Sequence, residues 1–154
     1  MEPQSPIDVT IIEDQSEVGE GLAILINGTA GFRCAGSFRT MEEALRLIAN
    51  DLPSVILTDI GLPGMNGIEV IRILKQRHSN VPIVALTVND DDEEIFNALC
   101  AGASGYLLKD TQPARLLECL REVIAGGAPM SRKWRGVSFN YFASSARLIA
   151  PRTT

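Results

Sequence analysis

The chain has 154 residues, of which 45% are hydrophobic and 21% charged, and its formal charge is −5 at pH 7. This length suits one folded domain with some excess at one end, and the composition is typical of globular proteins rather than disordered ones. The negative charge argues against nucleic-acid binding by the main body, because neutralising phosphates requires clustered lysine and arginine. Three widely spaced cysteines without a nearby histidine pattern predict neither a disulfide framework nor a zinc site.

The two ends of the chain differ in character from its centre. The first residues lack the basic and apolar segments of a signal peptide, and no stretch is long enough to span a membrane, so we expect a cytoplasmic protein. We expect residues 1–6 to be flexible and residues 7–127 to form the folded domain. Residues 128–154 are basic and rich in aromatic side chains, and we expect a linker, a C-terminal helix or a tail there.

Five short apolar runs alternate with five segments of helical periodicity. Strands that alternate with helices of this length indicate successive βαβ units and a parallel sheet. Right-handed crossovers then place helices on both faces of the sheet. The sequence therefore predicts an α/β protein with a doubly wound, five-stranded sheet. The predicted strands are Ile7 to Ile12, Phe32 to Ser37, Val55 to Asp59, Ile83 to Thr87 and Gly105 to Leu108.

Each predicted strand is followed by a predicted helix. The second helix opens with the capping box Thr40-Met41-Glu42-Glu43, and the fifth begins near Pro113, a favoured first-turn residue. The fourth, Asp91 to Ala101, has few apolar positions, and weakly packed elements move at the lowest cost. Gly19 and Gly21 are expected to lower the stability of the first helix.

Acidic residues follow two of the predicted strands. Glu13 and Asp14 come directly after the first strand, and Asp59 closes the third. In open parallel sheets, ligands bind beyond the carboxyl ends of the strands. Carboxylates gathered there repel one another unless a cation neutralises them, and an oxygen-rich cluster open to water suits Mg²⁺. Each acid taken singly is also compatible with an ordinary solvated residue at a strand end.

A hydroxyl and an ammonium group are expected at the same edge. Thr87 ends the fourth strand and Lys109 follows the fifth. A metal, a lysine and a hydroxyl around one aspartate can stabilise the oxygens of a phosphoryl group during in-line transfer. Asp59 would then be a nucleophile that forms an aspartyl phosphate. Taken alone, Thr87 is equally compatible with a strand-end cap and Lys109 with a surface lysine.

These residues occur in the order found in a known family. The chain resembles a CheY-like response-regulator receiver domain over about residues 7 to 127. The last matching motif ends in Lys109-Asp110. This wording is similar to that of the NarL/FixJ subgroup, whose output is a LuxR-type helix-turn-helix. The matching segments are Glu13-Asp14, Asp59, Leu62 to Gly67, Thr87 and Ala101 to Asp110.

The resemblance implies the fold, the chemistry and the metal site. It implies the flavodoxin-like strand order 2-1-3-4-5, and Mg²⁺-dependent phosphotransfer to Asp59 from a histidine kinase or phosphotransfer protein. The protein would catalyse only its own phosphorylation and dephosphorylation, and would not otherwise be an enzyme. Asp14, Asp59 and the backbone carbonyl of Gly61 would hold the Mg²⁺, with Glu13 acting through metal-bound water.

The resemblance also implies a conformational switch. Thr87 and Lys109 would contact the phosphoryl oxygens, and Tyr106 would change position when Thr87 is drawn inward. The output would be transcription, with a homodimer as one possible assembly. DNA would be bound only by a LuxR-type domain, and the residues after Ser131 show no such pair of helices. The chain would therefore be either the receiver part of a longer regulator or a single-domain protein.

Two other functions compete with this interpretation. One is a phosphorylation-independent interaction module that keeps the fold without the switch. The other is a phosphatase of the haloacid-dehalogenase type, which needs a second aspartate two positions after the nucleophile, where this chain has Gly61. Within the receiver interpretation, Gly61 and the bulky Val88 next to Thr87 suggest slow loss of the phosphoryl group, since Val88 would narrow the access of water.

Overall fold

The computed structural model describes residues 5–61, 67–88 and 92–128. The predicted tail from residue 129 onward lies outside these residues, as do most of the predicted flexible N-terminus and the segment 62–66 of the motif after Asp59. Within the described residues, no helix is long and apolar enough to cross a membrane.

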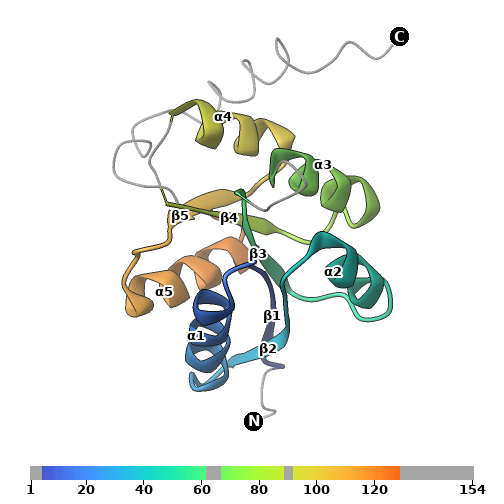
Figure 1. The fold of residues 1–154 in the computed structure, drawn as a ribbon. Coiled ribbons are helices and arrows are strands. Elements are labelled where there is room, and N and C mark those ends of the chain that lie inside the picture. The colour runs from blue at the N-terminus through green and yellow to red at the C-terminus, as the bar shows by residue number, and fades with distance from the viewer. Residues whose placement is uncertain (1–4, 62–66, 89–91, 129–154) are drawn as a thin grey trace, which may run out of the picture.

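Five strands form one parallel sheet in the order β2-β1-β3-β4-β5, which confirms the predicted topology (Figure 1). β2 ends one residue later than predicted, at Phe38, and the other four strands have the predicted bounds. β3 and β4 lie inside the sheet and are buried along their whole length, as expected for strands covered on both faces. The strands are β1 (Ile7–Ile12), β2 (Phe32–Phe38), β3 (Val55–Asp59), β4 (Ile83–Thr87) and β5 (Gly105–Leu108).

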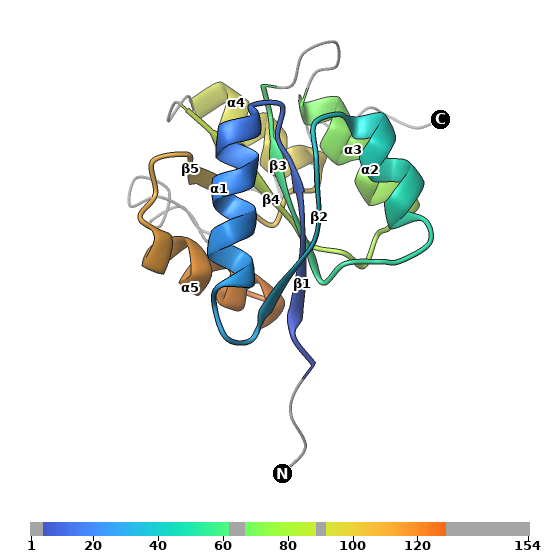
Figure 2. The same cartoon turned by 60° about the horizontal axis from the view of Figure 1, so that its bottom comes forward.

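The helices cover the two faces of the sheet in two separate layers. Figure 1 shows one layer on each side, and Figure 2 shows the sheet between α1 and α2. One apolar core packs beneath α2, α3 and α4, and a second packs beneath α1 and α5. The helices are α1 (Ser16–Asn27), α2 (Met41–Ile48), α3 (Gly67–Arg77), α4 (Asp92–Ala101) and α5 (Pro113–Ile124).

Local signals in the sequence account for several helix ends. The side chain of Thr40 accepts a hydrogen bond from the backbone N–H of Glu43 at 3.3 Å, which is one half of the predicted capping box. Pro113 occupies the first turn of α5, where its missing N–H costs nothing. Asp91, where the fourth helix was predicted to begin, lies outside the described residues, and α4 is described from Asp92 onward.

The two glycines of α1 have different surroundings. A Cβ atom at Gly21 would meet nothing within 4 Å, so this glycine only weakens the helix. A Cβ atom at Gly19 would lie 3.0 Å from Ser37 Oγ and 3.9 Å from Glu13 Cβ. Gly19 therefore lets α1 approach the end of β1, where the acidic residues begin.

Candidate functional site

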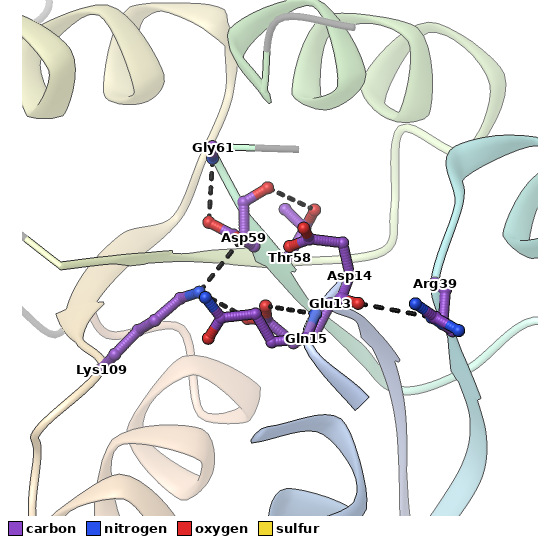
Figure 3. Close-up of polar contacts among 8 residues, drawn as sticks. All are labelled: Glu13, Asp14, Gln15, Arg39, Thr58, Asp59, Gly61 and Lys109. Atoms are coloured by element: carbon purple, nitrogen blue, oxygen red, sulfur yellow. Dashed lines mark hydrogen bonds and ion pairs between the residues drawn. The ribbon is translucent and has the colours of Figure 1, made fainter. Parts of the chain in front are cut away.

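Three carboxylates meet at the carboxyl edge of the sheet. Glu13 and Asp14 follow β1, and Asp59 is the last residue of β3, the neighbouring strand. One carboxylate oxygen from each of the three lies within 4.8 Å of the other two (Figure 3). The strand order thus brings together residues that are 45 positions apart in the sequence.

The adjacent residues Glu13 and Asp14 have different environments. The side chain of Glu13 is 0% exposed, and one of its oxygens accepts a hydrogen bond from the backbone N–H of Gln15 at 3.1 Å. Asp14 is only partly buried. Burial raises the pKa of Glu13 above its ordinary value, and the negative charge of Asp59 adds to the increase, although Lys109 and the Gln15 hydrogen bond oppose it. Placing a charge on Glu13 is therefore costly without a positive charge beside it.

Lys109 supplies a positive charge between two of the carboxylates. Its Nζ atom lies 2.8 Å from Glu13 Oε2 and donates a hydrogen bond of 3.0 Å to Asp59 Oδ2. The contact with Glu13 is an ion pair, and its geometry does not meet the criteria for a hydrogen bond. Burial by itself would lower the pKa of Lys109, but the two carboxylates together outweigh burial and raise it. Lys109 therefore stays a cation at neutral pH.

Backbone hydrogen bonds fix the position of Asp59 and Lys109. The N–H of Gly61 donates to Asp59 Oδ1 at 2.8 Å, so each oxygen of this carboxylate has a donor (Figure 3). The N–H of Lys109 donates to the carbonyl of Thr87 at 2.8 Å, which ties the end of β5 to the end of β4. Sequence reasoning considered only the carbonyl of Gly61 and missed the role of its N–H group.

Thr87 and Tyr106 lie on neighbouring strands and are both buried, at 3% and 1% exposure. Tyr106 is paired with Ala85, two residues before Thr87, so the two side chains share one face of the sheet. Tyr106 packs in the core beneath α2, α3 and α4. This arrangement places both residues next to the helical layer that contains α4.

Arg39 is a neighbour of the site that sequence reasoning missed. It follows β2, and its Nε donates a hydrogen bond of 3.3 Å to the backbone carbonyl of Asp14 (Figure 3). Together with Asp14, Thr40 and Glu43 it lines an open recess of about 320 Å³ beside the acidic cluster. No motif marks Arg39 in the sequence, because its proximity to Asp14 arises only from the pairing of β1 with β2.

The donor set fits a hard divalent cation. Glu13, Asp14 and Asp59 offer only oxygen ligands, and the ammonium of Lys109 balances one of their three negative charges. Mg²⁺ prefers oxygen ligands and is commonly held by one or two carboxylates and several waters. The partly exposed Asp14 leaves the cluster accessible to such an ion.

The sequence and the fold are similar to those of known proteins. Over 131 residues the chain is 33% identical to the nitrate/nitrite response regulator protein NarL of Escherichia coli, and the match covers 85% of this chain and 61% of that protein. Over 146 residues it is 33% identical to the transcriptional regulatory protein DegU of Brevibacillus brevis, with 95% of this chain and 61% of that protein covered. The chain thus spans about three fifths of the length of these two relatives, 61% in each case.

A solved structure and a family model agree with these relatives. The crystal structure of a LuxR-family two-component response regulator from Aurantimonas sp. SI85-9A1 superposes with a TM-score of 0.78 at 28% identity, covering 94% of this chain and 99% of that one. The family model described as the response regulator receiver domain matches residues 9–121. The chain therefore belongs to the receiver-domain family of two-component response regulators and is related to transcriptional regulators.

Proposed function

We propose that this receiver domain accepts a phosphoryl group on Asp59 from a phosphohistidine of a histidine kinase or phosphotransfer protein. The observation that carries the proposal is the 3.0 Å contact between Lys109 Nζ and Asp59 Oδ2 inside the acidic cluster. A conventional enzyme would release a product and turn over further substrate. Here the product is the modified protein itself, and its only reactions are its own phosphorylation and dephosphorylation.

The transfer is a nucleophilic displacement at phosphorus. A carboxylate oxygen of Asp59 forms a bond to phosphorus while the bond to the histidine nitrogen of the donor breaks, and an acyl phosphate results. Gly61 N–H and Lys109 hold the carboxylate in place through its two oxygens. Oδ1 and Oδ2 each keep a free lone pair for the attack, because a carboxylate oxygen has more than one.

Lys109 and Thr87 would stabilise the incoming phosphoryl group. Charge spreads over the phosphoryl oxygens during transfer, and donors already fixed in place stabilise that charge most effectively. Lys109 is fixed through its backbone bond to Thr87, and its raised pKa keeps it protonated. The Thr87 hydroxyl, at the end of the adjacent strand, is a second donor.

We infer that the acidic cluster holds Mg²⁺. Asp14 and Asp59 would bind it with the backbone carbonyl of Gly61, and the buried Glu13 would act through a water molecule. A bound Mg²⁺ supplies the positive charge that three carboxylates and a phosphoryl group require together. The support for this assignment is the all-oxygen donor set and the negative charge that Lys109 leaves unbalanced.

We further propose that phosphorylation moves Thr87 and Tyr106 together. A phosphoryl group adds about −1.5 to −2 charges and three acceptor oxygens, which can draw a hydroxyl toward it. Space vacated by the Thr87 side chain would then be open to the Tyr106 ring, which shares its face of the sheet. The layer containing α4 would report the change to an output. In a longer regulator that output would be transcription, through a separate LuxR-type DNA-binding domain.

Treatment with acetyl phosphate, with and without Mg²⁺, tests this function. We expect one phosphoryl group per chain by mass spectrometry, dependent on Mg²⁺ and absent from Asp59→Asn. Absence of labelling under every condition would instead support a phosphorylation-independent interaction module. Continuous hydrolysis of unrelated phosphoesters would support the phosphatase alternative.

A further inference from the structure

A recess on the opposite side of the sheet from α1 and α5 has no part in the site described above. It lies between the edge strand β2 and the C-terminal end of α2 and has a volume of about 210 Å³. Asn50 and Asp51, which also line it, precede β3, so this part of the recess lies at the edge of the sheet opposite to Asp59. Figure 2 shows β2 at the margin of the sheet with α2 beside it.

Small residues on β2 create the recess. The pairing of β1 with β2 shifts between Val9 and Thr10, so that Ala35 has no partner in the register and forms a bulge. A Cβ atom at Gly36 would lie 2.5 Å from Phe38 Cζ. The Phe38 ring therefore packs over this glycine and does not fill the recess between β2 and α2. Ala35 and Phe38 therefore form one wall of the recess and leave room for a further side chain.

Aliphatic side chains form the other wall. Leu47 and Ile48 at the end of α2 line the recess, and Leu47 is 51% exposed. Leu52, a few residues further on, is 55% exposed. The exposed leucine in the lining of this recess, together with the carboxylate of Asp51 in the same lining, suits a partner that is both apolar and basic.

The chain contains a segment with that chemistry. All 19 acidic residues precede residue 129, whereas five of the 14 basic residues follow it. Four of the eight aromatic residues also lie in the last 26 residues, including the single tryptophan, Trp134. Docking of a second copy of residues 1–128 would bring two acidic bodies together, whereas the basic segment is attracted to the acidic body.

We propose that the recess between β2 and α2 binds the chain's own C-terminal segment, residues 129–154, through its aromatic and basic side chains around Trp134. An extended segment of 26 residues reaches up to about 85 Å, which exceeds the width of a domain of this size. Because the segment is tethered, its effective concentration is of the order of millimolar, so even a weak contact is occupied. The contact does not depend on the chemistry of Asp59.

Trp134 reports this contact directly, because its fluorescence is the only tryptophan signal of the full chain. In Leu47→Glu we expect the emission to shift to longer wavelength and the acrylamide quenching constant to rise by about twofold, since the indole leaves an apolar environment. Ile24→Glu is the matched control, because Ile24 is 73% exposed on α1, across the sheet. Equal quenching in the wild-type chain and in Leu47→Glu would overturn the proposal, as would an equal change in Ile24→Glu.

A second variant tests the contact from the side of the segment. In the full chain, Arg132→Glu combined with Arg135→Glu should make backbone amides of residues 45–52 exchange hydrogen about threefold faster or more, while α1 exchanges at its wild-type rate. Unchanged exchange in residues 45–52 would contradict the proposal. A tryptophan signal that changes on dilution would show docking between copies and would also refute it. Asp59→Asn should leave the tryptophan fluorescence and the amide exchange unchanged. A failure of the docking proposal can therefore be distinguished from a failure of the phosphorylation proposal.

Discussion

Lys109 Nζ lies 3.0 Å from Asp59 Oδ2, although the two residues are 50 positions apart in the sequence. The contact exists because β4 pairs with both β3 and β5, and the backbone N–H of Lys109 is bonded to the carbonyl of Thr87 at the end of β4. The ammonium thus occupies a fixed place beside the carboxylate before any phosphoryl group arrives, which is the arrangement that favours charge stabilisation during transfer.

Replacing Lys109 by alanine should slow phosphorylation strongly. Removing one fixed donor to a developing negative charge typically costs about 10² to 10³ in rate, and we expect a loss in this range for Lys109→Ala with acetyl phosphate. Arg72→Ala is the control, because Arg72 pairs with Glu69 on the exposed surface of α3. A wild-type rate in Lys109→Ala would show that the ammonium has only a structural role.

Mg²⁺ should stabilise the fold through the three carboxylates. A ligand at 100 times its dissociation constant stabilises the folded state by about 2.7 kcal/mol, so the melting temperature should rise by several degrees on adding Mg²⁺. We expect Asp14→Asn to abolish most of this increase. Asp51→Asn, at the opposite edge of the sheet, should keep it. An equal increase in both variants would mean that Mg²⁺ binds elsewhere.

Two glycine substitutions should have opposite effects on stability. A Cβ atom at Gly67 would lie 2.1 Å from Ile60 Cα, a backbone atom that cannot give way without moving the segment after Asp59. Gly67→Ala should therefore lower the free energy of unfolding by about 3 kcal/mol or more. Gly21→Ala meets nothing within 4 Å and should raise it by about 0.5–1 kcal/mol. Urea denaturation measures both, and equal values for the two variants would contradict the packing at Gly67.

The lifetime of the phosphoryl group should depend on Val88. This side chain follows Thr87 at the end of β4 and is 72% exposed, so it borders the solvent at the carboxyl edge of the sheet. We expect Val88→Ala to admit water more easily and to raise the rate of dephosphorylation several-fold, with the phosphorylation rate less affected. Loss of the phosphoryl group at the wild-type rate in Val88→Ala would refute this role for the side chain.

The sequence predicted the strands and helices well because buried parallel strands and amphipathic helices have strong periodic signals. The edge strand β2 was predicted least well: its last residue, Phe38, and its bulge at Ala35 depend on pairing with β1. The sequence also predicted that Glu13, Asp14, Asp59 and Lys109 would gather at one edge, since strand ends determine that edge.

The environments within the site could not be predicted in the same way. Glu13 and Asp14 are adjacent and chemically similar, yet Glu13 is buried and Asp14 partly exposed, because the chain bends at Asp14 as it leaves β1. The close approach of Gly19 to Ser37 and of Arg39 to Asp14 joins separate elements, and neither leaves a local pattern.

The identity of the phosphoacceptor is tested most directly by chemical trapping. Borohydride reduces an acyl phosphate of aspartate to homoserine, so the chain is treated with acetyl phosphate and Mg²⁺, reduced, digested and sequenced by mass spectrometry. We predict homoserine at position 59 and at no other acidic position, and its loss when Mg²⁺ is omitted. Homoserine at position 14 with residue 59 intact, or a stable phosphoryl group on His78, the single histidine of the chain, would contradict the assignment of Asp59 as the phosphoacceptor.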